Sequence, residues 1–396
     1  MNRVWLLAAA VAVGQFANSM ILPVLPLLAR DFGVPAGSAG LVVTAYFAGF
    51  ALVGIVIGPL SDRLGRRPLL LAGLAMLAVG SVACALATSF LVLLACRLLE
   101  AAGAAGTPVL SRAIVRDTRQ DRDLAGALGL LATTMAVSPV LGPIIGGFVA
   151  DTLGWRWLFG VLAILAALAA LAVYAGVAET LTLSAPKDAV STWRQMRTLL
   201  ARRRFRKGTL FGAAYYFAFG AISTAAPFVL IEHFGLGHLQ FGVTFALIGA
   251  CFAVGGIVGP RLMRIATQAR LLDAAAGLAI VAGLLLFVLA REDSVASVIL
   301  CLGLFGLAFG IALSVGSALT LSDAGDAAGT ASSLSGCLQV GTAALGSVVA
   351  NLTHRGSVVP LAFFLLFAGL AALAAAWRLD DGSGPRPTPG AGRNAD

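Results

Sequence analysis

Two charged residues lie deep inside a mainly apolar run of the chain, residues 91–113, whose third charge, Arg112, is at its end. Arg97 and Glu100 are three positions apart, so both side chains project from one face of a helix. A carboxylate in apolar surroundings is costly unless it is paired or can change its charge. We therefore expect Glu100 to take up and release a proton, with Arg97 holding it charged until the two separate. The alternative is a purely structural pair, because one turn of helix neutralises both charges.

A second cluster of charge, GPLSDRLGRRP at 58–68, directly follows another apolar run. Gly58 lets helices approach closely, and Asp62 can accept hydrogen bonds from a helix N-terminus or an arginine. The spacing predicts a latch that forms in one conformation and breaks in another. A basic loop that only sets topology would explain the arginines but not the glycine and aspartate spacing. The residues of this predicted latch are Gly58, Asp62, Arg63, Gly65, Arg66 and Arg67.

A third segment, AVSPVLGPIIGG at 136–147, is rich in glycine and proline. Such residues remove side chains and backbone hydrogen bonds, so they predict a bent helix against which a neighbouring helix can pack and rock. The alternative is that small residues serve tight packing alone. The residues concerned are Pro139, Gly142, Pro143, Gly146 and Gly147.

The composition decides which solvent surrounds these elements. Of the 396 residues, 59% are hydrophobic and only 11% are charged, with a mean hydropathy of +0.96. A soluble domain carries about 25% charged residues, so this chain belongs in a lipid bilayer. Because roughly 20 residues cross the hydrocarbon core, the apolar runs predict an all-α polytopic protein. Its twelve transmembrane helices are expected at 4–28, 39–60, 68–88, 91–113, 124–149, 157–177, 209–231, 239–260, 271–290, 296–320, 327–351 and 358–377.

The distribution of Lys and Arg predicts the orientation of these spans, because basic loops stay cytoplasmic. With the N-terminus inside, nearly all of the 27 basic residues fall in inside segments. We therefore expect a multi-pass protein of a bacterial inner membrane with both termini cytoplasmic. The basic run at 201–207 is expected to lie near anionic lipid headgroups, and we expect no nucleic-acid partner. The exceptions to the inside distribution are Arg30, Arg97, Arg156, Arg291 and Arg355.

The two halves of the sequence look like copies of one six-helix unit. Pro26 and Gly58 of the first half recur, at the same offset, as Pro227 and Gly259 of the second. An even number of spans returns the chain to its starting side, so the copies form a parallel repeat. The predicted organisation is a bundle at 1–178, a cytoplasmic linker at 179–208, a second bundle at 209–377 and a disordered cytoplasmic tail at 378–396.

These motifs together resemble a known family. The segments GPLSDRLGRRP, RLLEAAGAAG (97–106) and AVSPVLGPIIGG are similar to the loop, span 4 and antiporter motifs of the major facilitator superfamily. Up to about residue 377 the chain resembles its bicyclomycin and chloramphenicol resistance (Bcr/CflA) branch of drug:proton antiporters. The other segments that carry this likeness are ILPVLP (21–26), VRD (115–117), GWRWLF (154–159) and AGTASSLSG (328–336).

The resemblance implies that the protein exports small drug-like molecules in exchange for protons. It also exposes a departure, because members of this branch commonly carry an acidic residue in span 1 where this chain has Ser19, beside Asn18. Either Glu100 substitutes for that acid or the coupling differs. The family arrangement further implies a central cavity at the membrane midplane. With few fixed charges, it is expected to accept neutral or weakly polar amphiphiles; its candidate residues are Gln15, Asn18, Tyr46, Tyr215, Tyr216, Phe219, Thr244 and Gln339.

The sequence lacks the motifs that other functional classes require. No Gly-Lys-Ser/Thr phosphate loop, catalytic triad or metal-ligand spacing is present, and the five cysteines all fall inside predicted spans. We therefore expect no enzymatic activity, no metal and no cofactor, and an ion gradient as the energy source. The protein is expected to act as a monomer. The alternative to drug export is dedicated export of an endogenous metabolite, such as an amino acid derivative, sugar, nucleoside or siderophore.

Overall fold

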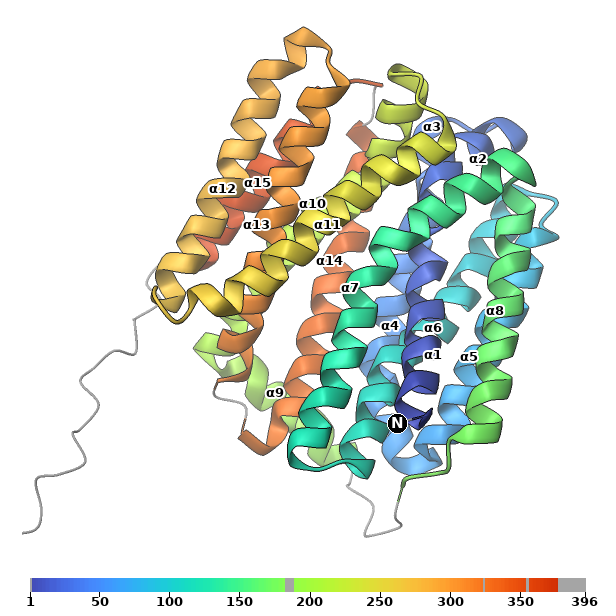
Figure 1. The fold of residues 1–396 in the computed structure, drawn as a ribbon, viewed down its shortest axis with the longest axis vertical. Coiled ribbons are helices and arrows are strands. Elements are labelled where there is room, and N and C mark those ends of the chain that lie inside the picture. Colours follow the sequence, from blue (N-terminus) through green and yellow to red (C-terminus); the bar gives the residue numbers. More distant parts are fainter. Residues whose placement is uncertain (1, 182–188, 323–324, 354–355, 377–396) are drawn as a thin grey trace, which may run out of the picture.

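The apolar runs form long helices, because a backbone inside a membrane must satisfy its own hydrogen bonds. The computed structural model describes residues 2–181, 189–322, 325–353 and 356–376, and these ranges hold helices and no strand. The first bundle in Figure 1 comprises α1 (Asn2–Ser19), η1 (Leu22–Val24), α2 (Leu25–Asp31), α3 (Ala36–Ala39), α4 (Leu41–Leu64), α5 (Arg66–Ala85), α6 (Phe90–Thr118), α7 (Asp121–Thr152) and α8 (Trp155–Gly176).

The second bundle follows a short helix, α9 (Ala189–Ala201), in the predicted linker. The first turns of α10 take up part of the basic run at 201–207. The predicted tail at 378–396 lies outside the described residues. The second bundle comprises α10 (Arg203–Pro227), η2 (Phe228–His233), α11 (His238–Leu262), α12 (Gln268–Leu289), η3 (Ala290–Glu292), α13 (Val295–Leu321), η4 (Gly325–Ala327), α14 (Ala328–Thr353) and α15 (Val359–Ala376).

The prediction of twelve spans is confirmed. Within the described residues, 12 helical runs are long and apolar enough to cross a membrane. The first, Arg3–Asp31, is interrupted between α1 and α2, because Pro23 and Pro26 carry no N–H for the helix ladder. The seventh, Arg203–His233, changes from α-helix to π-helix after Pro227. Both interruptions fall at the proline positions that marked the sequence repeat.

The two ends of the molecule differ in charge, and we name them accordingly. The basic end carries Arg66, Arg67 and α9, and the N-terminus lies there in Figure 1. The opposite end carries α2 and α3. That the basic end faces the cytoplasm stays a prediction.

Helices α7 and α11 form the first seam between the bundles, and it is made of small residues. A Cβ added at Gly242 of α11 would lie 3.0 Å from Cα of Ile144, and one added at Gly249 would lie 3.1 Å from Cγ2 of Val140. At the opposite end of this seam, Asp151 accepts a hydrogen bond from the backbone N–H of Leu239 (3.0 Å). The close contacts of the seam therefore lie in the half of α7 farther from the basic end.

Helices α4 and α14 form the second seam, which is polar near the opposite end. The Ser347 hydroxyl lies 2.7 Å from the hydroxyls of both Thr44 and Thr224, and the Asn351 amide donates to Thr44 Oγ1 (3.2 Å). Gly40 packs directly on Asn351. The cluster joins α4 of the first bundle to α10 and α14 of the second.

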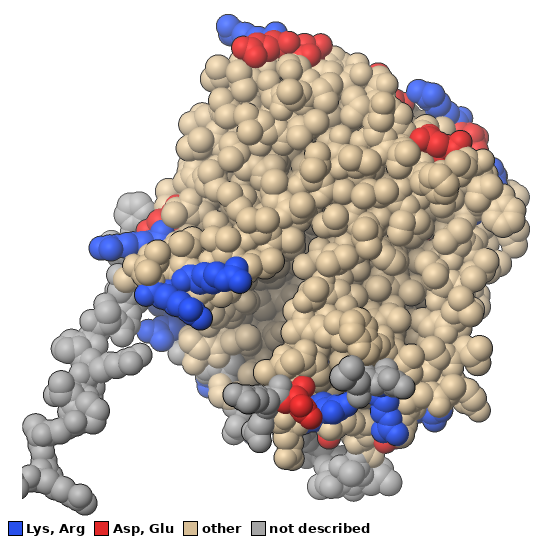
Figure 2. All heavy atoms as spheres, viewed as in Figure 1, with Lys and Arg blue, Asp and Glu red and all other residues tan. Residues whose placement is uncertain are grey.

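Toward the basic end the second seam opens. A Cβ added at Gly54 would lie 2.7 Å from Cys337 Sγ, but one added at Gly58, the next turn of α4, would meet nothing within 4 Å. The prediction that helices approach closely at Gly58 is therefore wrong for this conformation. Figure 2 shows the surface hollowed between the two bundles toward the basic end. The bundles are thus in close contact at the opposite end and leave a hollow, the inter-bundle space, toward the basic end, where Gly329 of α14 still packs on Arg116 of α6.

The α7–α11 seam yields a stability prediction. Gly242→Leu should lower the thermal unfolding midpoint of the purified protein, because a larger side chain cannot enter without displacing the α7 backbone. Overpacking of this kind costs about 1–3 kcal/mol. Gly277→Leu on α12 is the control, since an added Cβ there meets nothing within 4 Å. Equal midpoints for the two variants would contradict this description of the seam.

Candidate functional site

The Arg97–Glu100 pair is completely buried in the first bundle. Both side chains are 0% exposed, and Arg97 Nη1 donates to Glu100 Oε2 within α6. The same nitrogen donates to the carbonyl oxygen of Ala17 in α1 (3.0 Å), and the Ser81 hydroxyl of α5 donates to Glu100 Oε1 (2.7 Å). The predicted pairing is therefore present, and it links three helices. In this conformation the carboxylate is sealed from solvent.

Aromatic rings complete the surroundings of Arg97. Its guanidinium carbon lies 4.8 Å from the ring centroid of Tyr46 and 5.9 Å from that of Phe159. The Tyr46 hydroxyl donates to the carbonyl oxygen of Gly14 (2.8 Å). A cation over an aromatic face is attracted to it, and more strongly when both are desolvated. Tyr46, which is predicted to line the substrate cavity, is 3% exposed, and its ring lies against the Arg97 guanidinium instead.

The pair does not use the whole guanidinium. Among the described residues, Arg97 Nε and Nη2 have no hydrogen-bond partner although both are buried. A charged side chain at the centre of a membrane costs about 2.5–3.5 kcal/mol on insertion scales, so unused donors there are unusual. The Glu100 carboxylate accepts side-chain hydrogen bonds from one arginine and one serine. Another donor, or a proton bound to the carboxylate itself, can take the place of either.

Ser19, at the position of the missing acid, is packed against α7. Its hydroxyl donates to the backbone carbonyl oxygen of Gln15 (3.2 Å) and lies 3.4 Å from the backbone carbonyl oxygen of Ser138. The side chain is 5% exposed, and Gly142 is in direct contact with it. Serine at this position therefore allows α1 and α7 to touch.

Helix α7 carries the glycine- and proline-rich segment between two neighbours. Gly142 and Gly146 pack on α1, at Ser19 and Met20. Pro143 and Gly147 lie against α11 of the other bundle, where Cα of Leu239 would lie 2.8 Å from a Cβ added at Gly147. Pro139 also lies on the α11 side, where its carbonyl oxygen would be 3.6 Å from a Cβ added at Gly249. The segment thus joins the helix of Ser19 to the second bundle.

The predicted latch contains a turn that requires glycine. Gly65 adopts a φ of +97° between α4 and α5, a conformation that residues with a Cβ rarely take. Arg66 then pairs with Asp117 of α6 (2.8 Å) and more loosely with Asp62 (3.5 Å). Thr180 donates to the same Asp117 carboxylate (3.0 Å). Arg66 therefore connects the turn to α6.

Glu179 is a functional candidate that sequence reasoning missed. Its carboxylate accepts hydrogen bonds from the backbone N–H groups of Arg66 and Arg67, both 3.2 Å, at the start of α5. It also accepts from Thr180 (2.8 Å) and Leu181 (2.9 Å). Partial burial acts to raise the pKa of Glu179, but these four backbone hydrogen bonds outweigh it and hold the pKa below its usual value. An isolated acid after span 6 gives no motif by which to find it.

The remaining contacts of the predicted latch also stay inside the first bundle. Arg67 Nη2 donates to the carbonyl oxygen of Tyr174 in α8 (2.7 Å), and its guanidinium lies over the Tyr174 ring. In the part of the chain that the structure describes, Arg63 has no acidic partner. The latch residues thus connect α4, α5, α6 and α8. Their role as a latch stays a prediction.

The candidate cavity residues divide by burial. Tyr216 and Phe219 of α10 are half-buried at the bundle boundary, with the Phe219 ring 6.1 Å from that of Phe47 in α4. Tyr215, their neighbour, is 0% exposed and stacks on Phe309 inside the second bundle. Thr244 and Gln339 are also buried, whereas Gln15 and Asn18 are half-buried. The structure therefore brings Tyr216 and Phe219 together at the boundary and places Tyr215 in the core.

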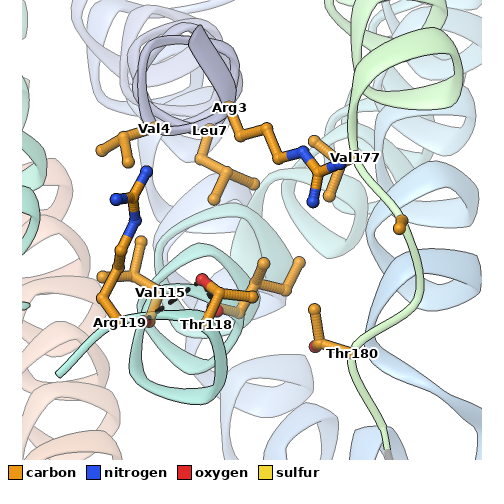
Figure 3. A pocket seen from close by; sticks show the side chains of 10 residues that line it. Arg3, Val4, Leu7, Val115, Thr118, Arg119, Val177 and Thr180 are labelled. Carbon is orange, nitrogen blue, oxygen red and sulfur yellow. Dashed lines mark hydrogen bonds between the residues drawn. The ribbon is translucent and has the colours of Figure 1, made fainter. Parts of the chain in front are cut away.

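A separate cavity of about 590 Å³ lies within the first bundle (Figure 3). Arg3 and Leu7 of α1 and Arg119 beside α6 line it, and Val177 and Thr180 close its other side. It lies at the basic end, beside the segment that carries Glu179. It is therefore distinct from the inter-bundle space.

Comparison with known proteins agrees with this architecture. The family model described as Major Facilitator Superfamily matches residues 7–347. The multidrug transporter MdfA of Yersinia pestis is 28% identical over 341 residues, which are 85% of this chain and 83% of the relative. A chloramphenicol resistance protein of Pseudomonas aeruginosa is 28% identical over 358 residues, 89% of this chain and 85% of the relative. A bacterial homolog of the human lysosomal transporter Spinster, in an inward-facing and unoccupied conformation, superposes with a TM-score of 0.76 at 17% identity, covering 94% of this chain and 96% of that one.

Glu179 yields a pH-dependent prediction. Glu179→Ala should lower the free energy of unfolding at pH 7 by about 1 kcal/mol, typical of a lost helix cap. Because the folded-state pKa of Glu179 is depressed, its stabilisation is complete above the unfolded pKa and is lost as the pH falls through the folded one. The gap between wild type and variant should therefore shrink on acidification in thermal-shift measurements. Glu292→Gln, on an exposed side chain, is the control; a gap that stays constant with pH would exclude the charged cap.

Proposed function

The chain belongs to the major facilitator superfamily, and we propose that it exports small amphiphilic molecules, drugs among them, across the bacterial inner membrane in exchange for protons. As a member of this family it is a multi-pass transport protein rather than an enzyme. The names of the relatives, a multidrug transporter and a chloramphenicol resistance protein, support drugs as substrates.

The observation that carries this proposal is the unequal contact between the bundles. The α7–α11 and α4–α14 seams are close at the opposite end, and Gly58 and Gly336 face no neighbour within 4 Å toward the basic end. With the basic end in the cytoplasm, the inter-bundle space opens inward. Rocking the bundles about α7 would close it and open the other side, which is alternating access.

In this mechanism the predicted latch acts at the cytoplasmic side. Arg66 is paired with Asp117 and Asp62 in the inward-open conformation. When the bundles close there, α14 approaches Gly58, and Asp62 becomes available to a partner on the second bundle. The latch then stabilises the outward-open conformation and breaks when the transporter returns.

Glu100 is the proposed proton carrier, because Ser19 has no ionisable group. The carboxylate is ionised while Arg97 and Ser81 hold it. A shift of α1 would withdraw the Ala17 carbonyl from Arg97 and change the balance of the pair. The pair would then load a proton from one side and release it to the other as the bundles rock.

Glu100→Gln tests the coupling. In inside-out membrane vesicles, gradient-driven accumulation of chloramphenicol and a fluorescent drug should fall to the level measured without a proton gradient, because the amide cannot exchange a proton. Glu292→Gln should accumulate drug like wild type, and the amount of protein in the vesicles should be equal. Retained accumulation in Glu100→Gln would refute its role. No accumulation in wild type would favour a dedicated exporter of an endogenous metabolite.

Asp62→Asn tests the latch. We expect the variant to bind drug with unchanged affinity and to transport it more slowly, because the substitution weakens one conformation without reaching the inter-bundle space. Equilibrium binding to purified protein and initial rates in vesicles separate the two effects. An unchanged rate would count against the latch, and weaker binding would place Asp62 in the substrate site.

A further inference from the structure

The cavity of about 590 Å³ within the first bundle has no role in the proposed mechanism (Figure 3). Small-molecule sites in proteins commonly have volumes of about 300–1,000 Å³. The inner surface of this cavity is formed by buried apolar residues of three segments: Val4, Leu7, Ile114, Val115 and Val177. The cavity can therefore hold an apolar group of small-molecule size.

Two arginines lie on either side of this apolar surface. Figure 3 shows the side chains of Arg3 and Arg119 on opposite sides of Leu7. Arg3 is exposed, and among the described residues no acidic side chain lies within ion-pair distance of it. Arg119 pairs loosely with Asp123 (3.5 Å), whose side chain is 77% exposed, and surface pairs of this kind contribute little free energy. Both guanidinium groups are therefore available to an anion.

The other polar side chains around the cavity are already engaged. Thr118 donates to a backbone carbonyl oxygen of its own helix (2.8 Å), and Thr180 donates to Asp117 (3.0 Å). Asp117 is paired with Arg66, and Glu179 accepts hydrogen bonds from the backbone at the start of α5. The charge that the cavity presents to a ligand is therefore positive.

The cavity lies at the level where membrane spans begin and end. Of the candidate spans, Arg3–Asp31 begins beside it, and Phe90–Thr118 and Trp155–Gly176 end beside it. The ends of spans mark the boundary between the hydrocarbon core and the lipid headgroups. Basic pockets between membrane helices bind the headgroups of anionic lipids, and the planar donors of arginine match phosphate. Phosphate is therefore the anion that best fits this position.

We propose that this cavity binds a phosphate-bearing amphiphile, whose phosphate pairs with Arg3 and Arg119 while its apolar part packs on Leu7. The phosphate can belong to a lipid headgroup or to an ester in solution, because both present the same chemistry. Thr180 lines the cavity and donates to Asp117, so the occupant lies beside the predicted latch and apart from the inter-bundle space. The site goes beyond the proposed export function and does not depend on it.

The test is equilibrium binding to purified full-length protein in phosphatidylcholine nanodiscs, whose lipids carry no net charge. The probes are hexyl phosphate against hexanol, dihexanoyl phosphatidylglycerol against zwitterionic dihexanoyl phosphatidylcholine, and inorganic phosphate alone. We expect at least one anionic amphiphile to bind more tightly than its matched partner. Arg3→Gln and Arg119→Gln should each lower its affinity about tenfold, as the loss of a charge-assisted hydrogen bond does. Binding of hexyl phosphate would identify an ester in solution as a source, and binding of the phosphatidylglycerol alone would identify a lipid headgroup.

Two further variants separate the position of the charge from the total charge and test the cavity itself. Arg270→Gln, which removes an exposed charge at the basic end of α12, should bind like wild type. Ala178→Phe keeps every charge but fills the cavity, which the exposed Ala178 lines, and it should lower the affinity as the arginine variants do. All four variants should keep the wild-type unfolding midpoint, because each changes a residue at the surface or at the cavity rim.

Three results would overturn the proposal. These are equal binding of both members of each pair by wild type, an anionic preference that survives when Arg3 and Arg119 are both replaced by Gln, and an equal loss of affinity in Arg270→Gln. Inorganic phosphate that binds as tightly as the anionic amphiphiles would also contradict it, because the apolar surface would then contribute nothing. No proton gradient enters these measurements. Failure of gradient-driven transport in vesicles, together with a preference that depends on Arg3 and Arg119, would therefore refute proton antiport and leave this site standing.

Discussion

The constraint on which this structure depends is the cost of ionised groups inside an apolar bundle. Arg97 and Glu100 satisfy it by neutralising each other, with Ala17 and Ser81 supplying further hydrogen bonds from α1 and α5. The first bundle is therefore organised around a polar centre. The core of the second is aromatic, with Tyr215 between Phe305 and Phe309, and among the described residues its core holds no ion pair. Coupling is proposed for the first bundle, while the second supplies an aromatic surface at the boundary.

The two seams suit the proposed rocking of the bundles in different ways. Glycines on α7 and α11 bring backbones together with few side chains to rearrange, so the helices can tilt about this contact. The α4–α14 seam is instead joined by hydroxyl and amide hydrogen bonds of Ser347 and Asn351, near the opposite end. These groups find equivalent partners in water when the seam opens. Small residues at the α7–α11 seam and exchangeable hydrogen bonds at the α4–α14 seam are both suited to repeated opening.

Much of the fold could be predicted from the sequence, because hydropathy and length alone determine which runs can cross a bilayer. The Arg97–Glu100 pair could also be predicted, since a spacing of three fixes two side chains on one helix face. The burial of individual aromatic residues could not be predicted. Tyr215 and Tyr216 are adjacent residues of the same type, and only tertiary packing decides which of them faces the other bundle. Glu179 was missed for a related reason. Its significance lies in a group distant in sequence, the backbone at the start of α5.

The central claim is that one buried carboxylate carries the coupling proton. The most direct measurement is the pH change when a drug is added to purified protein in weakly buffered solution, calibrated against the amount of drug bound. Proton coupling through Glu100 predicts a pH change that rises with occupancy and is absent in Glu100→Gln. Drug binding without a pH change, or the same change in Glu100→Gln as in wild type, would contradict it.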